Sequence, residues 1–186
     1  MEKLAILGGE TAIKNPLPTI KNSSGRWIGE EELSLLKEVI DSGTLAYIYG
    51  TKVGEFEKKF AALYNVKHAI AVNSGTSALH TAVIYLNPDP GDEIILSPIT
   101  DMGTAIPILY QNAVPIFADI DPETQTIDPQ KIEENITDRT KAIMVTHIFG
   151  GSADMDPIME VANSHNLLVI EDCAQALQTE YKERLV

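Results

Sequence analysis

The sequence predicts an α/β protein in which a largely parallel sheet carries helices on both faces. Short apolar runs typical of buried strands recur from residue 68 to residue 172. Segments whose apolar residues recur at helical spacing lie between these runs. Each connection is also long enough for a helix to cross the sheet, and such crossovers are right-handed and join parallel strands. Strands that alternate with helices in this way build a sheet covered on both faces.

The N-terminal part of the chain has a different character. Residues 1–28 are expected to form an irregular N-terminal arm, because closely spaced proline, asparagine and glycine residues disfavour a helix. Two helices are expected next, over 30–43 and 51–64, where apolar residues recur at helical spacing and charged residues occupy the other face. No repeat or second domain is evident. Residues 29–186 are therefore assigned to one domain.

The remaining strands and helices alternate along the chain. The strands are expected at 68–72, 92–97, 113–120, 141–148 and 167–172. The helices are expected at 73–86, 103–112, 128–136 and 153–166. Asp128 is a good N-cap and Pro129 suits the first helical position. Pro107 is expected either in the first turn of its helix or at a kink.

Composition excludes several classes of function. The 186 residues contain 27 Asp and Glu against 14 Lys and Arg, a net charge of -13, which argues against a nucleic-acid or anionic-membrane partner. The single cysteine, Cys173, excludes an internal disulfide and a cysteine-based metal cluster. The N-terminus lacks a secretory pattern, and no apolar run approaches the roughly 20 residues of a membrane span. We expect a soluble, cytoplasmic protein without a metal site.

Polar segments follow four of the predicted strands, at the carboxyl ends where open parallel sheets bind ligands. These segments are 73–78, 97–102, 147–151 and 171–175. In the first of them, Gly75 allows a sharp turn, and Thr76 and Ser77 offer free N–H groups and hydroxyls at a helix N-terminus, which suits a phosphate. The alternative is an ordinary Ser or Thr N-cap of a strand-to-helix turn.

Asp172 ends the last predicted strand, after four consecutive apolar residues and Glu171. A buried carboxylate is costly unless it meets a cation or a hydrogen-bond donor. The candidate partners are a metal, an arginine or the protonated ring nitrogen of a cofactor, and the alternative is a helix cap. Neither the G-x-x-x-x-G-K-[ST] loop nor the GxGxxG fingerprint occurs in the chain, which disfavours nucleotide hydrolases and NAD enzymes.

Two other reactive residues have structural interpretations. His147 ends a strand and is interpreted as a satisfied core or turn histidine rather than a ligand. The other three histidines have no spacing that suggests a metal. Cys173 lies beside Asp172 without a nearby cation, which disfavours its thiolate, so it is interpreted as a small packing residue.

Nine segments occur in order along nearly the whole chain. They are LAILGG (4–9), GEEEL (29–33), SG (42–43), VGEFEKKFA (53–61), NSGTSALH (73–80), PGDEIILSP (90–98), PIFADIDPET (115–124), ITDRTKAIMVTHIFG (136–150) and VIEDCAQAL (169–177). Together they resemble the DegT/DnrJ/EryC1/StrS family of sugar aminotransferases, which use pyridoxal 5'-phosphate (PLP) on the fold-type-I scaffold. The resemblance implies that this chain is the N-terminal part of such an enzyme.

The resemblance also implies roles for individual residues. Gly75, Thr76 and Ser77 would hold the PLP phosphate, Asp172 would pair with the pyridinium nitrogen, and Gln175 would hydrogen-bond the phenolic oxygen. The reaction implied is transfer of an amino group, from glutamate or glutamine, to a keto group of a nucleotide-linked sugar or related polyol. The complete enzyme is expected to be a homodimer.

Two departures from the family pattern stand out. Members place an aromatic residue after the second strand to stack on the PLP ring, whereas Asp101 or Met102 falls there in this chain, and only Met102 would cover the ring apolarly. The lysine that forms the Schiff base with PLP follows the strand-end aspartate by roughly 30 residues in this family. It is therefore expected beyond Val186, and Lys182 matches a segment before it. Residues 29–186 are thus expected to be a truncated large domain, without its C-terminal strands and the small domain.

Three alternatives stay open at this point. A PLP- or PMP-dependent sugar dehydratase of the same superfamily carries His in place of the lysine. A non-catalytic binding or assembly module would fit a chain that is complete as it stands. A nucleotide-binding fold without PLP is supported only by the strand-to-helix turn that begins at Asn73.

Overall fold

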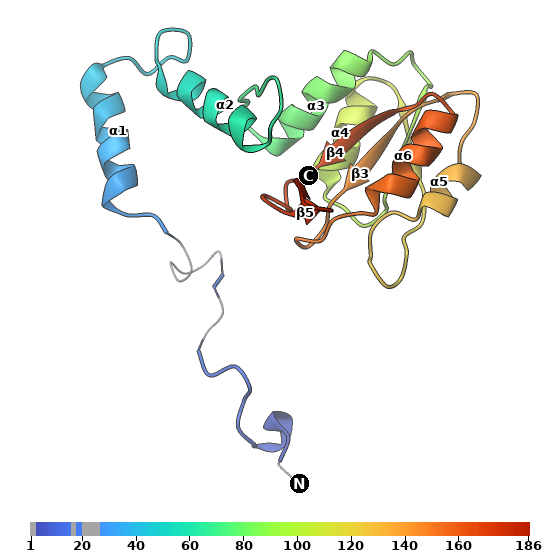
Figure 1. The fold of residues 1–186 in the computed structure, drawn as a ribbon, viewed down its shortest axis with the longest axis horizontal. Helices are drawn as coiled ribbons and strands as arrows, with labels where there is room; N and C mark the ends of the chain where they lie inside the picture. Colours follow the sequence, from blue (N-terminus) through green and yellow to red (C-terminus); the bar gives the residue numbers. More distant parts are fainter. Residues whose placement is uncertain (1–2, 16–17, 20–26) are drawn as a thin grey trace. The chain divides into compact units, whose positions relative to one another are not determined.

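The chain divides into two compact units, Met1–Gly54 and Glu55–Val186. The computed structural model describes residues 3–15, 18–19 and 27–186 (Figure 1). Each unit is described by itself. Among the described residues, no helix is both long and apolar enough to cross a membrane.

A parallel four-stranded sheet forms the centre of the second unit. Its strands are β1 (Glu93–Leu96), β2 (Val114–Phe117), β3 (Thr140–Thr146) and β4 (Leu168–Asp172). They lie in the order β2-β1-β3-β4, and every neighbouring pair is parallel. The predicted fold class, an α/β protein with a largely parallel sheet, is confirmed.

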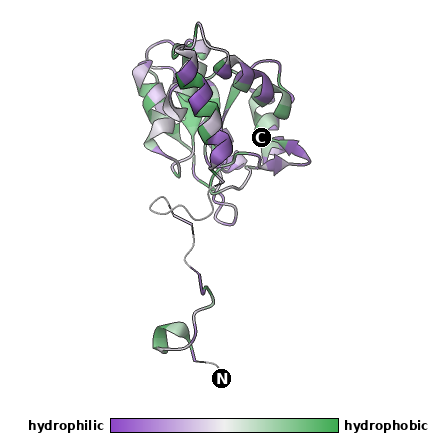
Figure 2. Ribbon diagram, turned by 90° about the vertical axis from the view of Figure 1, so that its left-hand side faces the viewer, coloured by the Kyte–Doolittle hydropathy of each residue, from purple (hydrophilic) through white to green (hydrophobic). Residues whose placement is uncertain are grey.

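Helices cover both faces of this sheet (Figure 1). The helices are α3 (Gly75–Leu86), α4 (Met102–Tyr110), α5 (Pro129–Glu134) and α6 (Met155–Ser164). Because side chains alternate along a strand, Ile94 and Met144 face α3 and α4, whereas Ile95 and Ile143 face α5 and α6. The strands are correspondingly hydrophobic, shown green in Figure 2, and the helices around them also carry hydrophilic residues.

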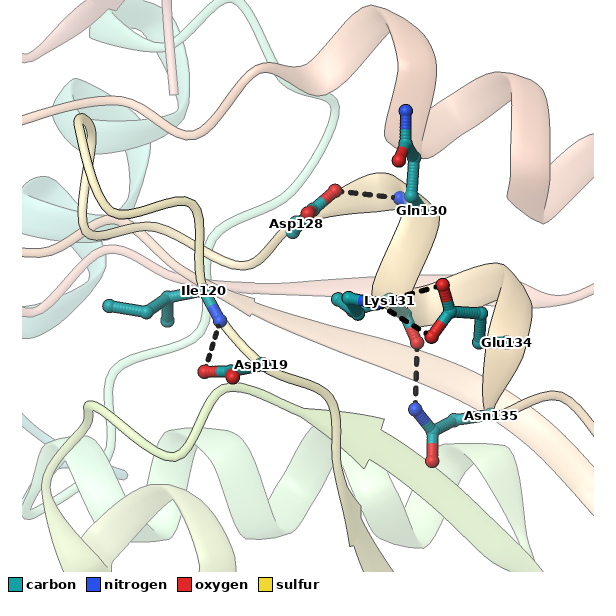
Figure 3. Close-up of polar contacts among 7 residues, drawn as sticks. All are labelled: Asp119, Ile120, Asp128, Gln130, Lys131, Glu134 and Asn135. Carbon is teal, nitrogen blue, oxygen red and sulfur yellow. Dashed lines mark hydrogen bonds and ion pairs between the residues drawn. The ribbon is translucent and has the colours of Figure 1, made fainter.

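The start of α5 follows the sequence prediction closely (Figure 3). Asp128 is the N-cap, and its carboxylate accepts a hydrogen bond of 2.8 Å from the N–H of Gln130, while Pro129 occupies the first helical position. Lys131 pairs with Glu134 at 2.8 Å one turn later. In α4, by contrast, Pro107 lies inside the helix, past its first turn.

The strand predicted at 68–72 is absent, and this prediction is wrong. Ile70 is 74% exposed, and no backbone hydrogen bond joins the segment to a strand within the described residues. The N–H of Ala71 donates instead to the carboxylate of Glu57, at 2.9 Å. A strand forms only when a neighbour pairs with its backbone. The segment lines an apolar groove together with residues of α3 and with Leu168–Ile170 of β4.

A short hairpin near the end of the chain is absent from the sequence prediction. Its strands are β5 (Glu180–Tyr181) and β6 (Arg184–Leu185). The two turn residues, Lys182 and Glu183, have φ angles of 48° and 66°. Such a turn is usually signalled by asparagine or glycine, neither of which occurs here. The Tyr181 hydroxyl donates to Asp154 at 2.6 Å and accepts from the N–H of Asp156, which ties the hairpin to the start of α6.

The first unit contains the short helix η1 (Ala5–Leu7), helix α1 (Glu30–Ser42) and the start of α2 (Lys52–Leu63). Both longer helices were expected from apolar periodicity and are confirmed within one or two residues. The backbone N–H of Gly29 donates to the carboxylate of Glu32 at 2.6 Å, which satisfies one of the unpaired donors at the start of α1.

Candidate functional site

The candidate site lies at the carboxyl ends of the strands, as expected for a parallel sheet. Thr146 of β3 and Asp172 of β4 are direct neighbours in the strand register. The segments that follow β1, β3 and β4 are linked to one another by side-chain hydrogen bonds at this edge. The structure therefore brings the loops predicted from the sequence together.

Asp172 is the most buried charged group of the site, with 7% of its surface exposed. One carboxylate oxygen, Oδ1, accepts from the N–H of Ala174 at 3.1 Å, and the other, Oδ2, accepts from the hydroxyl of Thr104 at 2.6 Å. No lysine or arginine among residues 3–15, 18–19 and 27–186 forms an ion pair with it. Asp172 is thus a buried carboxylate that has hydrogen-bond donors but no cation.

The N-terminus of α3 forms a second part of the site. Ser74 is the N-cap, and its hydroxyl oxygen accepts from the N–H of Ser77 at 3.1 Å. The prediction of a free N–H at Ser77 is therefore wrong, because the capping hydroxyl reaches the third residue of the helix. The N–H groups of Gly75 and Thr76 donate to no other group in the described part of the chain. The Ser74 hydroxyl donates to that of Ser77 at 3.0 Å, which leaves the proton of Ser77 available. The two N–H groups, the Thr76 hydroxyl and the proton of Ser77 therefore remain for an anion.

The first turn of α4 connects these two parts. A Cβ added to Gly103 would lie 2.6 Å from Oγ1 of Thr76, and the next residue, Thr104, bonds Asp172. Asp101 is the N-cap of α4, since its Oδ1 accepts from the N–H of Gly103 at 2.7 Å. Met102, by contrast, is 63% exposed. Of the two residues that occupy the expected aromatic position, Met102 is the one available to cover a flat ligand.

The close approach of Gly103 to Thr76 leads to a test of the anion site. In the Gly103→Ala variant, the new methyl group would also lie 2.9 Å from Oδ1 of Asp101. Both obstructing atoms end side chains that can rotate. Rotation of Asp101 gives up its N-cap bond, which costs about 1 kcal/mol, whereas alanine favours a helix by up to about 1 kcal/mol over glycine. We expect stability to change by less than about 1 kcal/mol, while PLP affinity falls roughly fivefold because the Thr76 hydroxyl is displaced.

Absorbance titration with PLP measures this affinity, and Gly54→Ala in α2 is the matched control. A Cβ at Gly54 would meet nothing within 4 Å, so this variant should bind PLP as the wild type does. Unchanged affinity in Gly103→Ala would mean that Thr76 does not contact the phosphate.

Gln175 has a fixed amide orientation. Its Oε1 accepts from the backbone N–H of Phe149 at 3.1 Å, across the turn that follows β3. Because an amide has one oxygen and one NH2 group, this bond leaves the NH2 group of Gln175 as a donor for an acceptor on a ligand. Phe149 itself has a φ of 55°, unusual for a residue other than glycine, and its side chain is exposed.

His147 is fully buried and satisfied on both ring nitrogens. Nδ1 accepts from the N–H of Ala153 at 3.1 Å, and Nε2 lies 2.9 Å from Glu171. Since Nδ1 acts as an acceptor, the proton of the neutral ring is on Nε2 and is donated to Glu171. The prediction of a satisfied core histidine is confirmed, and its bonds hold the turn at 148–153 against β4.

Comparison with known protein families identifies the family of the chain. A sequence model of the DegT/DnrJ/EryC1/StrS aminotransferase family matches residues 26–186. The chain belongs to this family.

The chain spans less than half the length of the curated relatives it matches. Spore coat polysaccharide biosynthesis protein SpsC of Bacillus subtilis (strain 168) is 48% identical over 159 residues, which are 86% of this chain and 40% of SpsC. GDP-perosamine synthase of Caulobacter vibrioides is 45% identical over 166 residues, 89% of this chain and 44% of that enzyme.

Solved structures of the family share the architecture. An aminotransferase from Psychrobacter cryohalolentis superposes with a TM-score of 0.84 at 37% identity, over 92% of this chain and 42% of its own. A GDP-4-keto-6-deoxymannose-3-dehydratase with a trapped PLP-glutamate geminal diamine gives a TM-score of 0.78 at 26% identity, over 83% of this chain and 41% of its own.

Lys182 is not suited to the role of the cofactor lysine of the DegT family. Its ammonium group pairs with Asp156, and hydrogen bonds first to Asp156 and then to Tyr181 raise its pKa. A lysine that attacks a carbonyl must lose its proton, which a raised pKa opposes. The structure therefore supports leaving Lys182 out of the candidate catalytic residues.

Cys173 directly follows Asp172 in the sequence and is held as a thiol. Burial, followed by the charges of Glu171 and Asp172, raises its pKa from 9.0 to about 12. At pH 8 we expect iodoacetamide to alkylate it roughly a thousandfold more slowly than a free cysteine, since the thiolate is the nucleophile. Alkylation followed by mass spectrometry measures the rate, and the protein unfolded in guanidinium chloride is the control. Rapid alkylation of the folded protein would contradict the raised pKa.

The same shift predicts how stability depends on pH. Between pH 9.0 and about 12 the unfolded thiol is ionised while the folded one keeps its proton. The folded state therefore binds more protons, and stability falls as the pH rises through this window.

Sequence reasoning missed several residues at this edge of the sheet. Thr104 bonds Asp172 directly, and the Phe149 backbone orients Gln175. No sequence signal points to either, because both contacts join residues far apart in the chain. Gly103 carries a partial signal, since a glycine inside a predicted helix often marks a close approach. Groups of three or more His, Cys, Asp or Glu side chains that could hold a metal do not occur among the described residues.

Proposed function

We propose that the protein carrying this chain is a PLP-dependent aminotransferase that acts on a nucleotide-linked keto sugar or related polyol. The observation that carries the proposal is Asp172, a buried carboxylate with two hydrogen-bond donors and no cationic side chain paired with it in the described part of the chain. A pyridinium N–H supplies the missing positive charge. The family membership of residues 26–186 supports the same chemistry.

The surrounding groups fit the rest of the cofactor. The free N–H groups of Gly75 and Thr76, with the hydroxyls of Thr76 and Ser77, suit a phosphate at the N-terminus of α3. The NH2 group of Gln175 suits an acceptor oxygen such as the phenolic oxygen of PLP. Met102 is exposed at the start of α4, next to the residues that contact both parts of the site, and suits the face of the ring.

Each of these residues then has a definite task. When bound, PLP supplies an electron sink for the carbanion that amino transfer requires. Asp172 holds a proton on the ring nitrogen, which keeps the ring electron-poor. Gln175 orients the phenolic oxygen, and the start of α3 anchors the phosphate so that the ring cannot shift during the reaction.

The substrate class, the amino donor and the assembly also belong to this proposal. SpsC and GDP-perosamine synthase carry names that refer to polysaccharide biosynthesis and a nucleotide-linked amino sugar. We assign the amino donor as glutamate or glutamine, the cofactor lysine to a position beyond Val186, and the active assembly to a homodimer. Residues 29–186 form part of the PLP-binding domain in this proposal.

A sugar dehydratase is the second candidate, because a GDP-4-keto-6-deoxymannose-3-dehydratase matches the structure. The two reactions differ in the fate of the substrate. Amino transfer puts a nitrogen on the sugar and releases one 2-oxo acid per turnover, whereas dehydration removes a hydroxyl group and leaves no nitrogen on the sugar.

The test uses the polypeptide encoded by the whole reading frame that contains these residues. It is titrated with PLP by visible absorbance and then incubated with a nucleotide-linked keto sugar and 15N-labelled glutamate or glutamine. The proposal expects a visible chromophore and 15N in the sugar product, detected by mass spectrometry. A product that has lost a hydroxyl without gaining 15N supports the dehydratase. The aminotransferase proposal is overturned if the reading frame encodes no lysine after Val186, or if PLP gives no visible chromophore.

A further inference from the structure

Three threonine hydroxyls form a continuous chain that ends on Asp172. Oγ1 of Thr104 lies 2.6 Å from Oδ2 of Asp172. Oγ1 of Thr100 lies 2.8 Å from Oγ1 of Thr104 and 3.0 Å from Oγ1 of Thr146. This series of hydrogen-bonded hydroxyls, the threonine relay, therefore runs from Thr146 through Thr100 and Thr104 to the Asp172 carboxylate.

Counting protons fixes the direction of every hydrogen bond in this chain. Thr104 donates its single hydroxyl proton to Asp172. Thr104 must then accept from Thr100, whose proton is used in that bond. Thr100 must in turn accept from Thr146. All three hydroxyl dipoles point toward Asp172, and hydrogen bonds aligned in a chain strengthen one another.

The threonine relay joins residues from separate parts of the fold. Thr100 belongs to the loop after β1, Thr104 to the first turn of α4, and Thr146 to β3, where it is paired in register with Asp172. Thr104 has no exposed surface and Thr146 is 5% exposed. Water therefore has little access to compete for the hydroxyls of Thr104 and Thr146, whereas Thr100 is half-buried.

The direction of the Thr104 side chain is itself informative. A threonine in a helix often bonds to the carbonyl four residues earlier on its own helix. Thr104 instead donates to a carboxylate 68 residues later in the chain. With Ala174 bonded to Oδ1, both oxygens of Asp172 are held, so the carboxylate plane cannot turn.

We propose that Thr104 is a positioning residue for the cofactor, with Thr100 and Thr146 as its supports. Resting on the proposed function, it holds the Asp172 carboxylate in one orientation, with the remaining lone pairs free for the pyridinium N–H. The relay acts only through Asp172.

The test removes one hydroxyl at a time in the polypeptide of the whole reading frame. Thr104→Val keeps the shape and deletes the donor, Thr104→Ser keeps the donor, and Thr146→Val breaks the far end of the relay. Thr126→Val is the matched control, because Thr126 is equally buried and its hydroxyl bonds only that of Thr124. Circular dichroism confirms that each variant is folded.

Two measurements report on the relay without measuring activity. The first is the dissociation constant of PLP, and the second is the 15N chemical shift of the ring nitrogen in bound PLP. We expect Thr104→Val to weaken PLP binding about tenfold, as for loss of a hydrogen bond to a charged group, and to move the 15N shift toward that of the unprotonated ring. Thr104→Ser should restore both, and Thr146→Val should show a smaller change in the same direction.

The outcomes separate this inference from the proposed function. If the wild type binds PLP with a protonated ring nitrogen but Thr104→Val does the same, the relay is overturned and the proposed function stands. Failure of Thr104→Ser to restore the 15N shift, or an equal change in Thr126→Val, also overturns the relay. A wild type that does not bind PLP overturns both. If Thr104→Val does not fold, Thr100→Val carries the test, because it keeps the bond to Asp172 and removes its support.

Discussion

Replacing Asp172 with alanine is expected to weaken PLP binding at least about 100-fold and to abolish amino transfer. Asp172 is buried, and the pyridinium N–H is the only cation that the proposal gives it. Removing one partner of a buried ion pair costs about 3–5 kcal/mol, and each 1.4 kcal/mol is tenfold in affinity. The PLP affinity of Asp172→Asn should lie between those of the wild type and Asp172→Ala, because asparagine keeps the shape and an acceptor oxygen but not the charge.

A cofactor analogue turns this result into a pairwise test. In an analogue with carbon in place of the ring nitrogen, the group that meets Asp172 is missing. The wild type should bind PLP much more tightly than this analogue, whereas Asp172→Ala should bind the two alike. Asp119→Asn is the control, since Asp119 also follows a strand but is exposed and bonds only the N–H of Ile120 (Figure 3). If the wild type and Asp172→Ala prefer PLP over the analogue to the same extent, the proposed contact between Asp172 and the ring nitrogen is excluded.

Replacing Ile143 with alanine is expected to cost about 2–5 kcal/mol of unfolding free energy, with about 0.5–1.5 kcal/mol for Ile143→Val. Ile143 is fully buried in β3, between Ile95 of β1 and Val169 of β4. The methylene groups that alanine lacks would leave a cavity under α5 and α6, because close-packed interiors collapse only in part.

Urea unfolding, monitored by circular dichroism, measures the difference in unfolding free energy between variant and wild type. The comparison holds when the slope of this free energy against urea concentration is the same for both. Met144→Leu is the control on the opposite face of the same strand, where a swap of similar volume should cost less than about 1.5 kcal/mol. A loss of less than about 1 kcal/mol in Ile143→Ala would show that the core between β3 and α6 is not close-packed.

Local patterns determined a large part of this protein. The parallel strands at 93–96, 114–117, 140–146 and 168–172 coincide with the apolar runs. The two central strands, β1 and β3, show the reason most clearly, because a strand buried on both faces must be largely apolar. The N-cap at Asp128 depends only on its neighbours. The position of the site also followed from the sequence, since the carboxyl ends of parallel strands meet at one edge of the sheet.

The tertiary structure decided the features that depend on which backbone and side-chain groups meet in the folded protein. The alternation at 68–72 resembles that of a strand, yet no neighbouring strand pairs with it in the described residues, so none forms. The cap formed by Ser74 removed one of the donors expected at Ser77. The sequence already favoured Met102 over Asp101 as the residue that covers the ring, and the structure adds that Asp101 is used as the N-cap of α4.

The residues that bond Asp172 show the same division between what the local sequence predicts and what the tertiary structure decides. A carboxylate after a buried strand indicates from the sequence alone that a partner must exist, because burying a charge is costly. The residues near Asp172 in the sequence do not reveal that partner. Thr104 lies on helix α4 and meets Asp172, at the end of β4, only when α4 packs over the sheet. The sequence by itself determined the strands, the edge where they end and the need for a counter-charge. The tertiary structure alone decided which hydroxyls, amides and helix ends surround that charge, because hydrogen bonds between distant segments leave no local pattern.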